Sequence, residues 1–407
     1  MYIIIRGYVQ TYTIFFTFAF LKNHTYNNYR MEKIAMVDLF GQYKKIRNEI
    51  DSAIQNVVES TAFINGPAVA AFQKNLESYL RTGHAITCGN GTDALQIALM
   101  SLELEPGDEV ITTPFTFIAT VEAIALLGLK PVFADVCSRS FNINTDEIKK
   151  AITGRTRVLL PVHLYGQCAD MDSIMDIAQK NNLYVIEDAA QALGSEYTFS
   201  SGVKKMAGTM GHIGCTSFFP SKNLGCFGDG GAMFTDNPEL GRKISSIRKH
   251  GSTVKYFHER TGVNSRLDTL QAAILDVKLK YLDQYNQARA KAADYYDDAL
   301  KGIETLTLPK RMKQSAHIFH TYTLKTDPSD RDPLREFLKS RDIPTMLYYP
   351  LPMHLQEGYL KYGYKKGDFP VSEELCSSVL SIPMHTELKE DQLEFICNSI
   401  IEYFKSG

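Results

Sequence analysis

One lysine, Lys222, stands in the run Thr216-Ser-Phe-Phe-Pro-Ser-Lys-Asn-Leu-Gly-Cys-Phe-Gly-Asp-Gly-Gly231, where four glycines occupy the nine residues after it. A lysine amine becomes a nucleophile at neutral pH only when burial or a nearby cation lowers its pKa. The glycines let the backbone turn tightly and approach a bound group. Apolar neighbours that can desolvate the amine are Phe218, Phe219, Leu224 and Phe227. The run therefore predicts a reactive lysine, although taken alone it also fits an ordinary surface lysine.

A short apolar strand with acidic residues at its end precedes this run. It reads Leu183-Tyr-Val-Ile-Glu-Asp188 and is typical of a buried parallel strand. Ligands of open α/β sheets bind at the carboxyl ends of such strands. A carboxylate there can keep a pyridine nitrogen protonated, as pyridoxal phosphate requires. We therefore expect Asp188 to face a cofactor and Glu187 to point to the opposite face of the sheet.

A glycine turn that opens a helix is found further upstream, in Cys88-Gly-Asn-Gly-Thr-Asp-Ala-Leu95. The first amides of a helix have no partner within the helix and attract anions. We expect the amides of Gly91 and Thr92 to bind a phosphate, and Asp93 to cap the helix or face solvent.

These three features together resemble a fold-type I pyridoxal-phosphate aminotransferase. Three segments resemble the DegT/DnrJ/StrS family of nucleotide-sugar aminotransferases in particular. They are Glu187-Asp-Ala-Ala-Gln191, Ser217-Phe-Phe-Pro-Ser-Lys222 and Asn264-Ser-Arg-Leu-Asp268. The resemblance extends from about Val37 to the C-terminus. It implies an enzyme in which Lys222 binds pyridoxal 5'-phosphate covalently and then carries the proton during amino transfer.

The resemblance also assigns cofactor contacts to individual residues. Asp188 would bind the pyridine nitrogen, Gln191 would lie beside the ring hydroxyl, and Phe117 would stack on the ring. The phosphate would be held by Gly91, Thr92, Ser217 and, from the other subunit of a homodimer with shared active sites, Asn264.

The substrate class follows from the same resemblance. The segments Leu164-Tyr-Gly-Gln-Cys-Ala-Asp170, Pro220-Ser-Lys-Asn-Leu-Gly-Cys226 and Asn264-Ser-Arg-Leu-Asp-Thr-Leu-Gln271 look most like aminotransferases that act on UDP-2-acetamido-2-deoxy-3-oxo-D-glucuronate, with L-glutamate as amino donor, for surface polysaccharide such as O-antigen. The predicted substrate contacts are Arg266, which can grip a carboxylate or diphosphate, and Tyr348, Tyr349 and His354. Family members often carry histidine where Tyr348 stands, and an interface salt bridge is the other interpretation of Arg266.

Four other functions remain in competition. A 3- or 4-keto-6-deoxyhexose on a dTDP or UDP carrier could be the substrate, because the cofactor motifs are shared. A dehydratase of the same fold would have histidine in place of Lys222. A catalytically silent regulatory protein of this fold would not need Lys222, Asp188, Gln191 and Ser217 together. A nucleotide-binding dehydrogenase would carry GxGxxG after a strand, but Gly89-Asn-Gly91 lacks the third glycine.

Several polar and aromatic residues near these motifs fit structural roles. We expect Phe115 to be core, and Ser221, Asn223 and Asp229 to shape the loop. His163, in Pro161-Val-His-Leu-Tyr-Gly166, could touch the cofactor or satisfy a buried backbone group equally well.

Composition excludes several classes of protein. The chain has 407 residues, 44% of them hydrophobic, and a formal net charge of −2, which suits a large core and two domains. Basic residues are not clustered, which argues against nucleic acid as a partner. Seven scattered cysteines without a CxxC pair favour a reducing cytoplasm and argue against a structural zinc or other metal site.

The fold class expected is α/β. From His84 to about Thr235 strands and helices alternate, which predicts a large domain with a mainly parallel seven-stranded sheet flanked by helices. The run from Gly262 to Leu275 should open a long helix that continues beyond Tyr285. The expected strands are Ala85–Cys88, Glu109–Thr112, Pro131–Ala134, Arg157–Val162, Leu183–Glu187, Cys215–Phe219 and Ala232–Thr235.

The domain boundaries expected are 36–285 for the large cofactor-binding domain and 286–407 for a smaller C-terminal α+β domain. Residues 1–35 would be a non-native or disordered extension, with translation starting at Met31 or Met36. A signal peptide would need a basic start and a small-residue cleavage site. A membrane anchor would need about 20 apolar residues, and Arg6 and Gln10 interrupt the run. We expect no membrane association.

Overall fold

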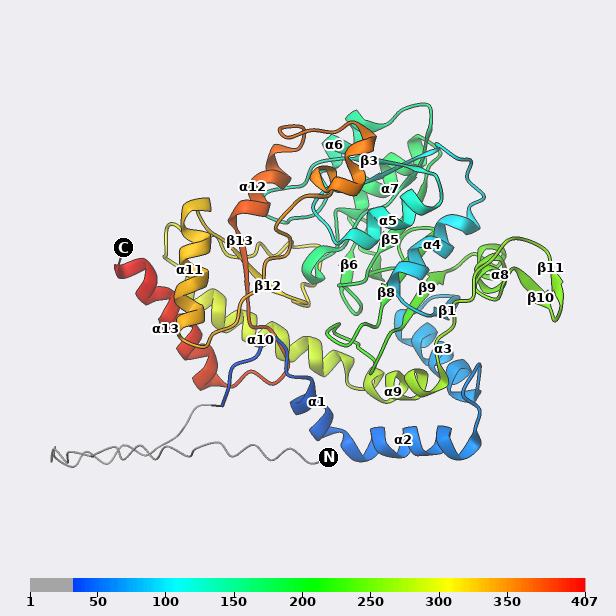
Figure 1. Cartoon of the computed structure of the whole chain (residues 1–407), viewed down its shortest axis with the longest axis horizontal. Helices are drawn as coiled ribbons and strands as arrows, with labels where there is room; N and C mark the ends of the chain where they lie inside the picture. Colours follow the sequence, from blue (N-terminus) through cyan, green and yellow to red (C-terminus); the bar gives the residue numbers. More distant parts are fainter. Residues whose placement is uncertain (1–31, 407) are drawn as a thin grey trace, which may run out of the picture. The chain divides into compact units, whose positions relative to one another are not determined.

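The computed structural model describes residues 32–406 (Figure 1). The chain forms one compact unit from Lys33 onward. Most of the predicted extension, residues 1–31, lies outside the described part. Its end does not: Ile34 is buried, and the carbonyl of Met36 accepts a hydrogen bond from Met384 N–H at 3.3 Å. The packed body therefore begins slightly before the predicted boundary at residue 36.

A seven-stranded sheet forms the centre of the fold, as predicted. Its strand order is β1-β9-β8-β5-β4-β2-β3. All neighbouring pairs are parallel except those of β9, which runs antiparallel to both β1 and β8. The bounds are β1 His84–Cys88, β2 Glu109–Thr112, β3 Lys130–Phe133, β4 Thr156–Leu159, β5 Tyr184–Asp188, β8 Ile213–Ser217 and β9 Gly231–Thr235.

β4 and β8 are the two strands whose ends differ from the expected ones by two or more residues; the other five agree within one residue. β4 stops at Leu159: Leu160 N–H makes a last bond to the Ile111 carbonyl, and Pro161 has no N–H to continue the ladder. β8 begins and ends two residues earlier than expected, so that Phe218 and Phe219 belong to the loop that carries Lys222. That loop therefore starts directly at the carboxyl edge of the sheet.

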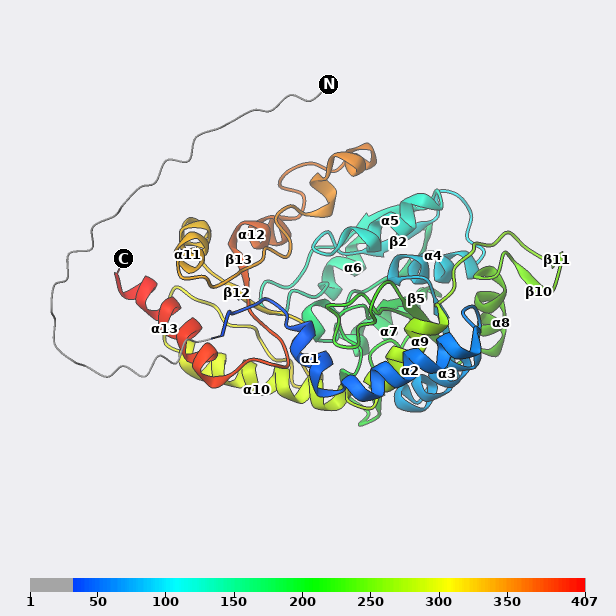
Figure 2. The ribbon, with the colours of Figure 1, turned by 60° about the horizontal axis from the view of Figure 1, so that its bottom comes forward.

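Helices cover both faces of the sheet (Figure 2). On one face, α4 (Gly91–Ser101), α5 (Ile118–Leu126) and α8 (Pro238–Ile247) pack residues such as Leu95, Ile124 and Ile244 against the strands. On the other face lie α3 (Pro67–Leu80) and α9 (Thr269–Leu279), against β1 and β9, and α6 (Thr145–Ala151) and α7 (Met171–Lys180), against the strands from β5 to β3. This is the two-sided cover that a mainly parallel sheet requires.

The long helix expected after residue 262 is two helices. α9 ends at Leu279 and α10 (Leu282–Leu300) follows after a short break. The predicted domain boundary between residues 285 and 286 thus lies inside α10. The C-terminal part combines α10, α11 (Pro328–Ser340), α12 (Pro370–Ser378) and α13 (Glu390–Ser406) with the antiparallel pair β12 (Tyr322–Lys325) and β13 (Val379–Ile382).

The remaining elements are short or peripheral. Figure 1 shows the β10–β11 hairpin beyond α8, at the opposite end of the view from α11 and α13. These elements are α1 Leu39–Lys45, α2 Arg47–Ser60, η1 Leu164–Gly166, β6 Glu196–Thr198, β7 Lys204–Met206, β10 Ser252–Val254, β11 Phe257–His258, η2 Met353–Leu355 and η3 Glu357–Tyr362.

Candidate active site

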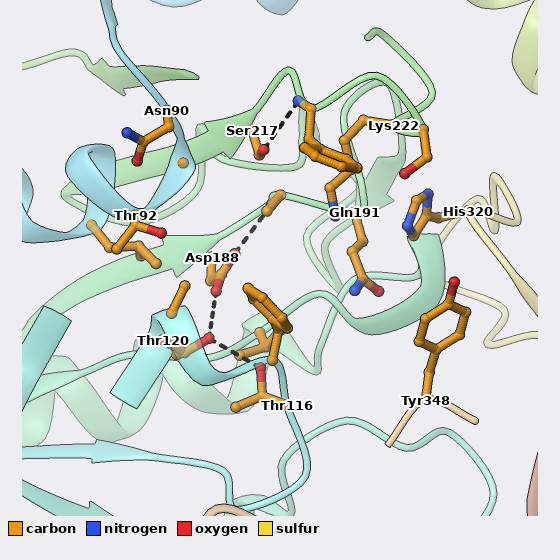
Figure 3. A pocket seen from close by; sticks show the side chains of 18 of the residues that line it. Asn90, Thr92, Thr116, Thr120, Asp188, Gln191, Ser217, Lys222, His320 and Tyr348 are labelled. Atoms are coloured by element: carbon orange, nitrogen blue, oxygen red, sulfur yellow. Dashed lines mark hydrogen bonds between the residues drawn. The ribbon is translucent and has the colours of Figure 1, made fainter. Parts of the chain in front are cut away.

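A cavity of about 810 Å³ opens at the carboxyl ends of the parallel strands. Its walls come from the start of α4, the β2–α5 connection, the ends of β5 and β8, and two C-terminal segments. Figure 3 shows the side chains that point into it. Of the residues predicted for the site, it brings together Gly91, Thr92, Phe117, Asp188, Gln191, Ser217, Lys222, Tyr348 and Tyr349.

Lys222 projects into this cavity from the loop after β8. Burial lowers the pKa of its amine to about 8, although the nearby Asp188 carboxylate opposes the shift. At pH 8 such an amine is about 150-fold more often deprotonated than an ordinary lysine. The loop is tightly folded: a Cβ on Gly225 would lie 2.3 Å from the carbonyl oxygen of Pro220. The local sequence thus produces a nucleophilic amine in a fixed place.

The neighbouring residue Asn223 anchors the loop to the C-terminal part of the chain. Its side chain is buried, and Nδ2 donates to Asn286 Oδ1 at 2.7 Å and to the Ile318 carbonyl at 3.2 Å. This is the loop-shaping role that the sequence suggested for Asn223. The prediction of four desolvating apolar residues is correct only in part, since Phe218 and Leu224 are buried but Phe219 is 53% and Phe227 43% exposed.

Asp188 is the last residue of β5 and faces the cavity. Thr120 Oγ1 donates to Oδ2 at 2.8 Å, and Ala190 N–H donates to Oδ1 at 3.1 Å (Figure 3). Thr120 in turn bonds Thr116 at 3.0 Å. Burial raises the pKa of Asp188 above its usual value, while these donors and Lys222 pull the pKa down. The carboxylate is held in one orientation at the cavity floor.

Glu187 points to the opposite face of the sheet, as expected from the pleat. It accepts hydrogen bonds from the backbone N–H groups of Gly208 at 2.8 Å and of Met210 and Gly211 at 2.6 Å. His163 Nε2 lies 2.8 Å from Glu187 Oε2, the oxygen that also accepts from Gly208, and His163 Nδ1 accepts from Ala169 N–H at 3.1 Å. His163 is fully buried and does not line the cavity. Of its two predicted roles, the structural one is therefore correct.

The start of α4 forms an amide-lined edge of the cavity. Asn90 caps the helix by accepting from Asp93 N–H at 2.8 Å, which leaves the N–H groups of Gly91 and Thr92 without an acceptor among the described residues. Asp93 does not cap the helix, because its carboxylate accepts from Ser265 Oγ at 2.6 Å. Ser217, at the end of β8, packs directly against Gly91.

Aromatic and amide groups form a further part of the cavity wall. Gln191 accepts from Tyr165 N–H at 2.7 Å and donates to the Tyr349 hydroxyl at 3.0 Å. Phe117 is 56% exposed on the cavity side, with its ring 6.2 Å from that of Tyr349. Phe115 is fully buried, in agreement with its predicted place in the core.

His354 does not belong to the site. Its side chain is fully buried, Nε2 lies 3.0 Å from Glu373, and its ring packs against Phe133 and Phe369. The prediction that it contacts substrate is wrong for this cavity, because Phe133 of β3 and Phe369 of the C-terminal part enclose the ring away from the cavity.

The segment carrying Asn264 and Arg266 lies outside the cavity of its own chain. Ser265 joins it to the start of α4, accepting from Gly89 N–H at 2.9 Å and donating to Asp93. The Asn264 side chain is exposed, and Arg266 makes no ion pair within residues 32–406. Asn264 and Arg266 therefore do not reach the cavity of their own subunit.

Sequence reasoning missed several residues of the site. Thr120 and His320 both line the cavity, and Asn90 holds the turn that shapes its edge. An Asn directly before a helix is a recognised cap signal and could have been found. His320 has no comparable signal, because it reaches the cavity from the segment before β12.

Neither a metal centre nor a membrane-spanning helix is found among the described residues. No group of three or more His, Cys, Asp or Glu residues within residues 32–406 is arranged to hold a metal ion. None of the helices in that range is both long and apolar enough to cross a bilayer.

Comparison with known families identifies the chain. A sequence model of the DegT/DnrJ/EryC1/StrS aminotransferase family matches residues 44–401. The chain belongs to this family. Its sheet, with the antiparallel β9 between β1 and β8, is the fold-type I architecture predicted above.

Relatives and solved structures agree with this assignment. A pleiotropic regulatory protein of Geobacillus stearothermophilus is 44% identical, covering 91% of this chain and 99% of the relative. The UDP-2-acetamido-2-deoxy-3-oxo-D-glucuronate aminotransferase of Pseudomonas aeruginosa is 42% identical, covering 90% and 99%. The crystal structure of Streptomyces venezuelae DesV in complex with a ketimine intermediate superposes with a TM-score of 0.88 at 38% identity, covering 92% and 99%.

DegT-family aminotransferases use pyridoxal phosphate, and the cavity of this member fits that cofactor. Two unpartnered amides at a helix start suit the phosphate. A buried carboxylate suits the pyridine nitrogen, and a lysine with a lowered pKa stands within the same cavity. This chain is therefore a pyridoxal-phosphate-dependent aminotransferase of the sugar aminotransferase type.

Proposed function

We propose that this enzyme transfers the amino group of L-glutamate to UDP-2-acetamido-2-deoxy-3-oxo-D-glucuronate, giving the 3-amino sugar for surface polysaccharide. The observation that carries the proposal is Lys222, whose lowered pKa and position opposite Asp188 suit amino transfer. The similarity to the Pseudomonas aeruginosa enzyme over nearly the whole chain supports this choice of sugar.

The phosphate of the cofactor would bind at the start of α4. The free amides of Gly91 and Thr92 and the hydroxyl of Ser217 face this place. Asn264 of the partner subunit would complete the site, since Asn264 is exposed and lies outside its own cavity. The active unit is then a homodimer in which each cavity contains residues of both chains.

The ring of the cofactor would lie between Phe117 and the end of β5. Asp188 would keep the pyridine nitrogen protonated, with Thr120 and Ala190 holding the carboxylate in place. Gln191 would lie beside the ring hydroxyl. When bound in this way, pyridoxal phosphate acts as an electron sink that lets the substrate release a proton from carbon.

Lys222 performs the steps that belong to the protein. Its deprotonated amine would hold the cofactor, and after amino exchange the free amine would carry a proton at Nζ between the substrate carbon and a carbon of the cofactor. A pKa of about 8 suits both tasks, since the amine can lose and regain a proton near neutral pH. Burial disfavours the charged form of the amine and so lowers its pKa, and a larger share of Lys222 is deprotonated near neutral pH than of an ordinary lysine.

Substrate contacts would come from both subunits. Tyr348 and Tyr349 line the cavity mouth near Phe117. Arg266 of the partner subunit would bind the sugar carboxylate, because a guanidinium forms two parallel hydrogen bonds with a carboxylate. This contact is the feature that favours a uronate over a neutral sugar.

The test is a coupled pair of reactions with purified protein. Pyridoxal phosphate and glutamate are added first, and the appearance of the pyridoxamine phosphate spectrum is recorded for wild type and Lys222→Ala. The keto-uronate is then added, and the amino sugar is identified by mass spectrometry. We expect both steps in the wild type and neither in Lys222→Ala.

Competing substrates separate the remaining alternatives. The neutral 3-keto analogue and a dTDP-linked keto-deoxyhexose are supplied to wild type and Arg266→Lys. Loss of a bidentate contact should lower kcat/KM for the uronate about 10–100-fold and leave the neutral analogue nearly unchanged. A preference of the wild type for the deoxyhexose would replace the proposed substrate. Absence of any glutamate reaction would favour a regulatory role, as the name of the Geobacillus relative suggests for that protein.

A further inference from the structure

His320 lies in the cavity without a role in the reaction described above. It comes from the segment before β12, and Figure 3 shows its ring between Lys222 and Tyr348. The backbone on both sides of the ring is fixed. His320 N–H donates to the Tyr165 carbonyl at 2.9 Å, and its own carbonyl accepts from Arg289 Nη1 at 3.2 Å.

The two ring nitrogens of His320 have different surroundings. Nδ1 is buried and has no hydrogen-bond partner among the described residues. Nε2 is not enclosed in this way, and the ring lines the cavity. Among buried backbone groups, an N–H without an acceptor is rarer than a C=O without a donor, and we apply the same preference to the ring nitrogens. The proton therefore belongs on Nε2, where a ligand in the cavity can accept it.

The imidazole is also held in its neutral form. Burial lowers the pKa of His320 well below its usual value, and the charges of Lys222 and Arg289 act in the same direction. His320 is thus a neutral donor placed next to the reactive lysine, and it does not compete with Lys222 for protons.

The charges around the cavity define what this donor can bind. The acidic residues that line it are Asp93, Asp188 and Asp229, and Lys222 is the only cation of the described chain in its lining. An amino donor such as glutamate carries its α-carboxylate on the carbon that loses a proton. That carbon has to come within reach of Lys222 Nζ. Because the α-carboxylate is bonded directly to the same carbon, it also lies close to Lys222.

We propose that His320 binds the α-carboxylate of the amino donor through Nε2–H. This assignment rests on the proposed function. A neutral donor suits a cavity that also has to admit a keto sugar, which bears a hydroxyl or amide rather than a carboxylate next to the reacting carbon. An arginine in this place would leave an unpaired buried charge when the sugar is bound.

The first experiment compares His320→Gln with His320→Leu in the glutamate half-reaction. Glutamine keeps a neutral N–H at similar reach, whereas leucine fills the space without a donor. We expect leucine to weaken glutamate binding about 10–100-fold, and glutamine to stay within about threefold of wild type. Binding of 4-aminobutyrate, which is glutamate without its α-carboxylate, should be the same in all three proteins.

The second experiment uses the protein without cofactor. Histidines labelled with 15N are observed by NMR, and the signal of His320 is assigned by its absence in His320→Gln. We expect a protonated Nε2 and a bare Nδ1. This measurement does not depend on activity and remains available if the leucine variant is unstable.

Three results would overturn the proposal for His320. These are unchanged glutamate binding in His320→Leu, an equal loss for glutamate and 4-aminobutyrate, which indicates a structural role, and a proton on Nδ1. Failure of the proposed function is a separate result, because the wild type itself would then not react with glutamate.

Discussion

Replacing Gly91 by alanine tests whether the contact between α4 and β8 shapes a phosphate site. A Cβ at this position would lie 2.7 Å from Cβ and 3.2 Å from Cα of Ser217. Carbon atoms in contact prefer about 3.5–4.0 Å, so the helix start and the strand end have to separate by about 1 Å. Neither can move easily, because Ser217 pairs with Gly231, and a Cβ on Gly231 would itself lie 2.4 Å from the carbonyl oxygen of Asn90.

The expected consequences are a loss of stability and a weaker cofactor site. Overpacking of this kind costs about 1–3 kcal/mol of folding free energy. Loss of one hydrogen bond to a charged phosphate weakens cofactor binding about 10–100-fold. Titration of the apoprotein with pyridoxal phosphate, followed by absorbance, measures the second effect, and thermal unfolding without cofactor measures the first.

Two control variants make the result interpretable. Gly83→Ala adds the same methyl group just before β1, where the nearest atom is Asp236 Cα at 3.5 Å, an ordinary contact. It should leave both quantities unchanged. Combining Gly91→Ala with Ser217→Gly removes the Cβ–Cβ contact at 2.7 Å and leaves the contact with Cα at 3.2 Å. It should restore much of the stability but not the cofactor affinity, because it also removes the Ser217 hydroxyl from the phosphate site. Wild-type affinity in Gly91→Ala alone would refute the reasoning.

Three further predictions concern the other walls of the cavity. The rate at which the apoprotein captures pyridoxal phosphate covalently should rise about tenfold per pH unit below pH 8 and level off above it. The reason is the lowered pKa of Lys222, which leaves most of the amine deprotonated only above about pH 8. A rate measured by stopped-flow absorbance that does not change between pH 6 and 8 would contradict this. Asp188→Asn should still bind cofactor but slow the glutamate half-reaction by at least about 100-fold, because the amide does not stabilise a protonated pyridine nitrogen. A wild-type rate in a single-turnover experiment would count against the role assigned to Asp188. Asn223→Ala should lower the free energy of unfolding by about 1–3 kcal/mol, because it leaves Asn286 Oδ1 and the Ile318 carbonyl without their buried donor. Urea denaturation measures this difference. Unchanged stability would show that water replaces the donor.

Much of the fold followed from local patterns. Each of the seven strands is a short apolar run between turn signals, so their existence was predicted and only their ends were displaced. Lys222, Asp188 and Gly91 were expected together because parallel strands and the helices after them meet at one edge of a sheet. The family resemblance supplied the expectation that Lys222 joins the other two, and the structure brings all three into one cavity.

The residues that were misplaced depend on contacts between distant segments. His354 looked like a substrate contact from its neighbours in sequence, but Glu373 and Phe369 enclose its ring. His320 was missed because Tyr165 and Arg289, far away in the chain, bring it to the cavity. The break between α9 and α10 could not be predicted from a helix-breaking residue, because no glycine or proline occurs there. Periodicity does not encode such tertiary contacts.

The strand order also determines when the enzyme can first hold its cofactor during synthesis. β1 pairs with β9, so the edge of the sheet next to α4 cannot close until the chain has been made as far as Thr235. The cavity then still lacks His320 and Tyr349. A domain with such long-range pairing folds late. On the ribosome, the amides at the start of α4 are therefore present before the walls around Lys222 are complete. Cofactor supply during translation should therefore stabilise completed chains and have little effect on truncated ones.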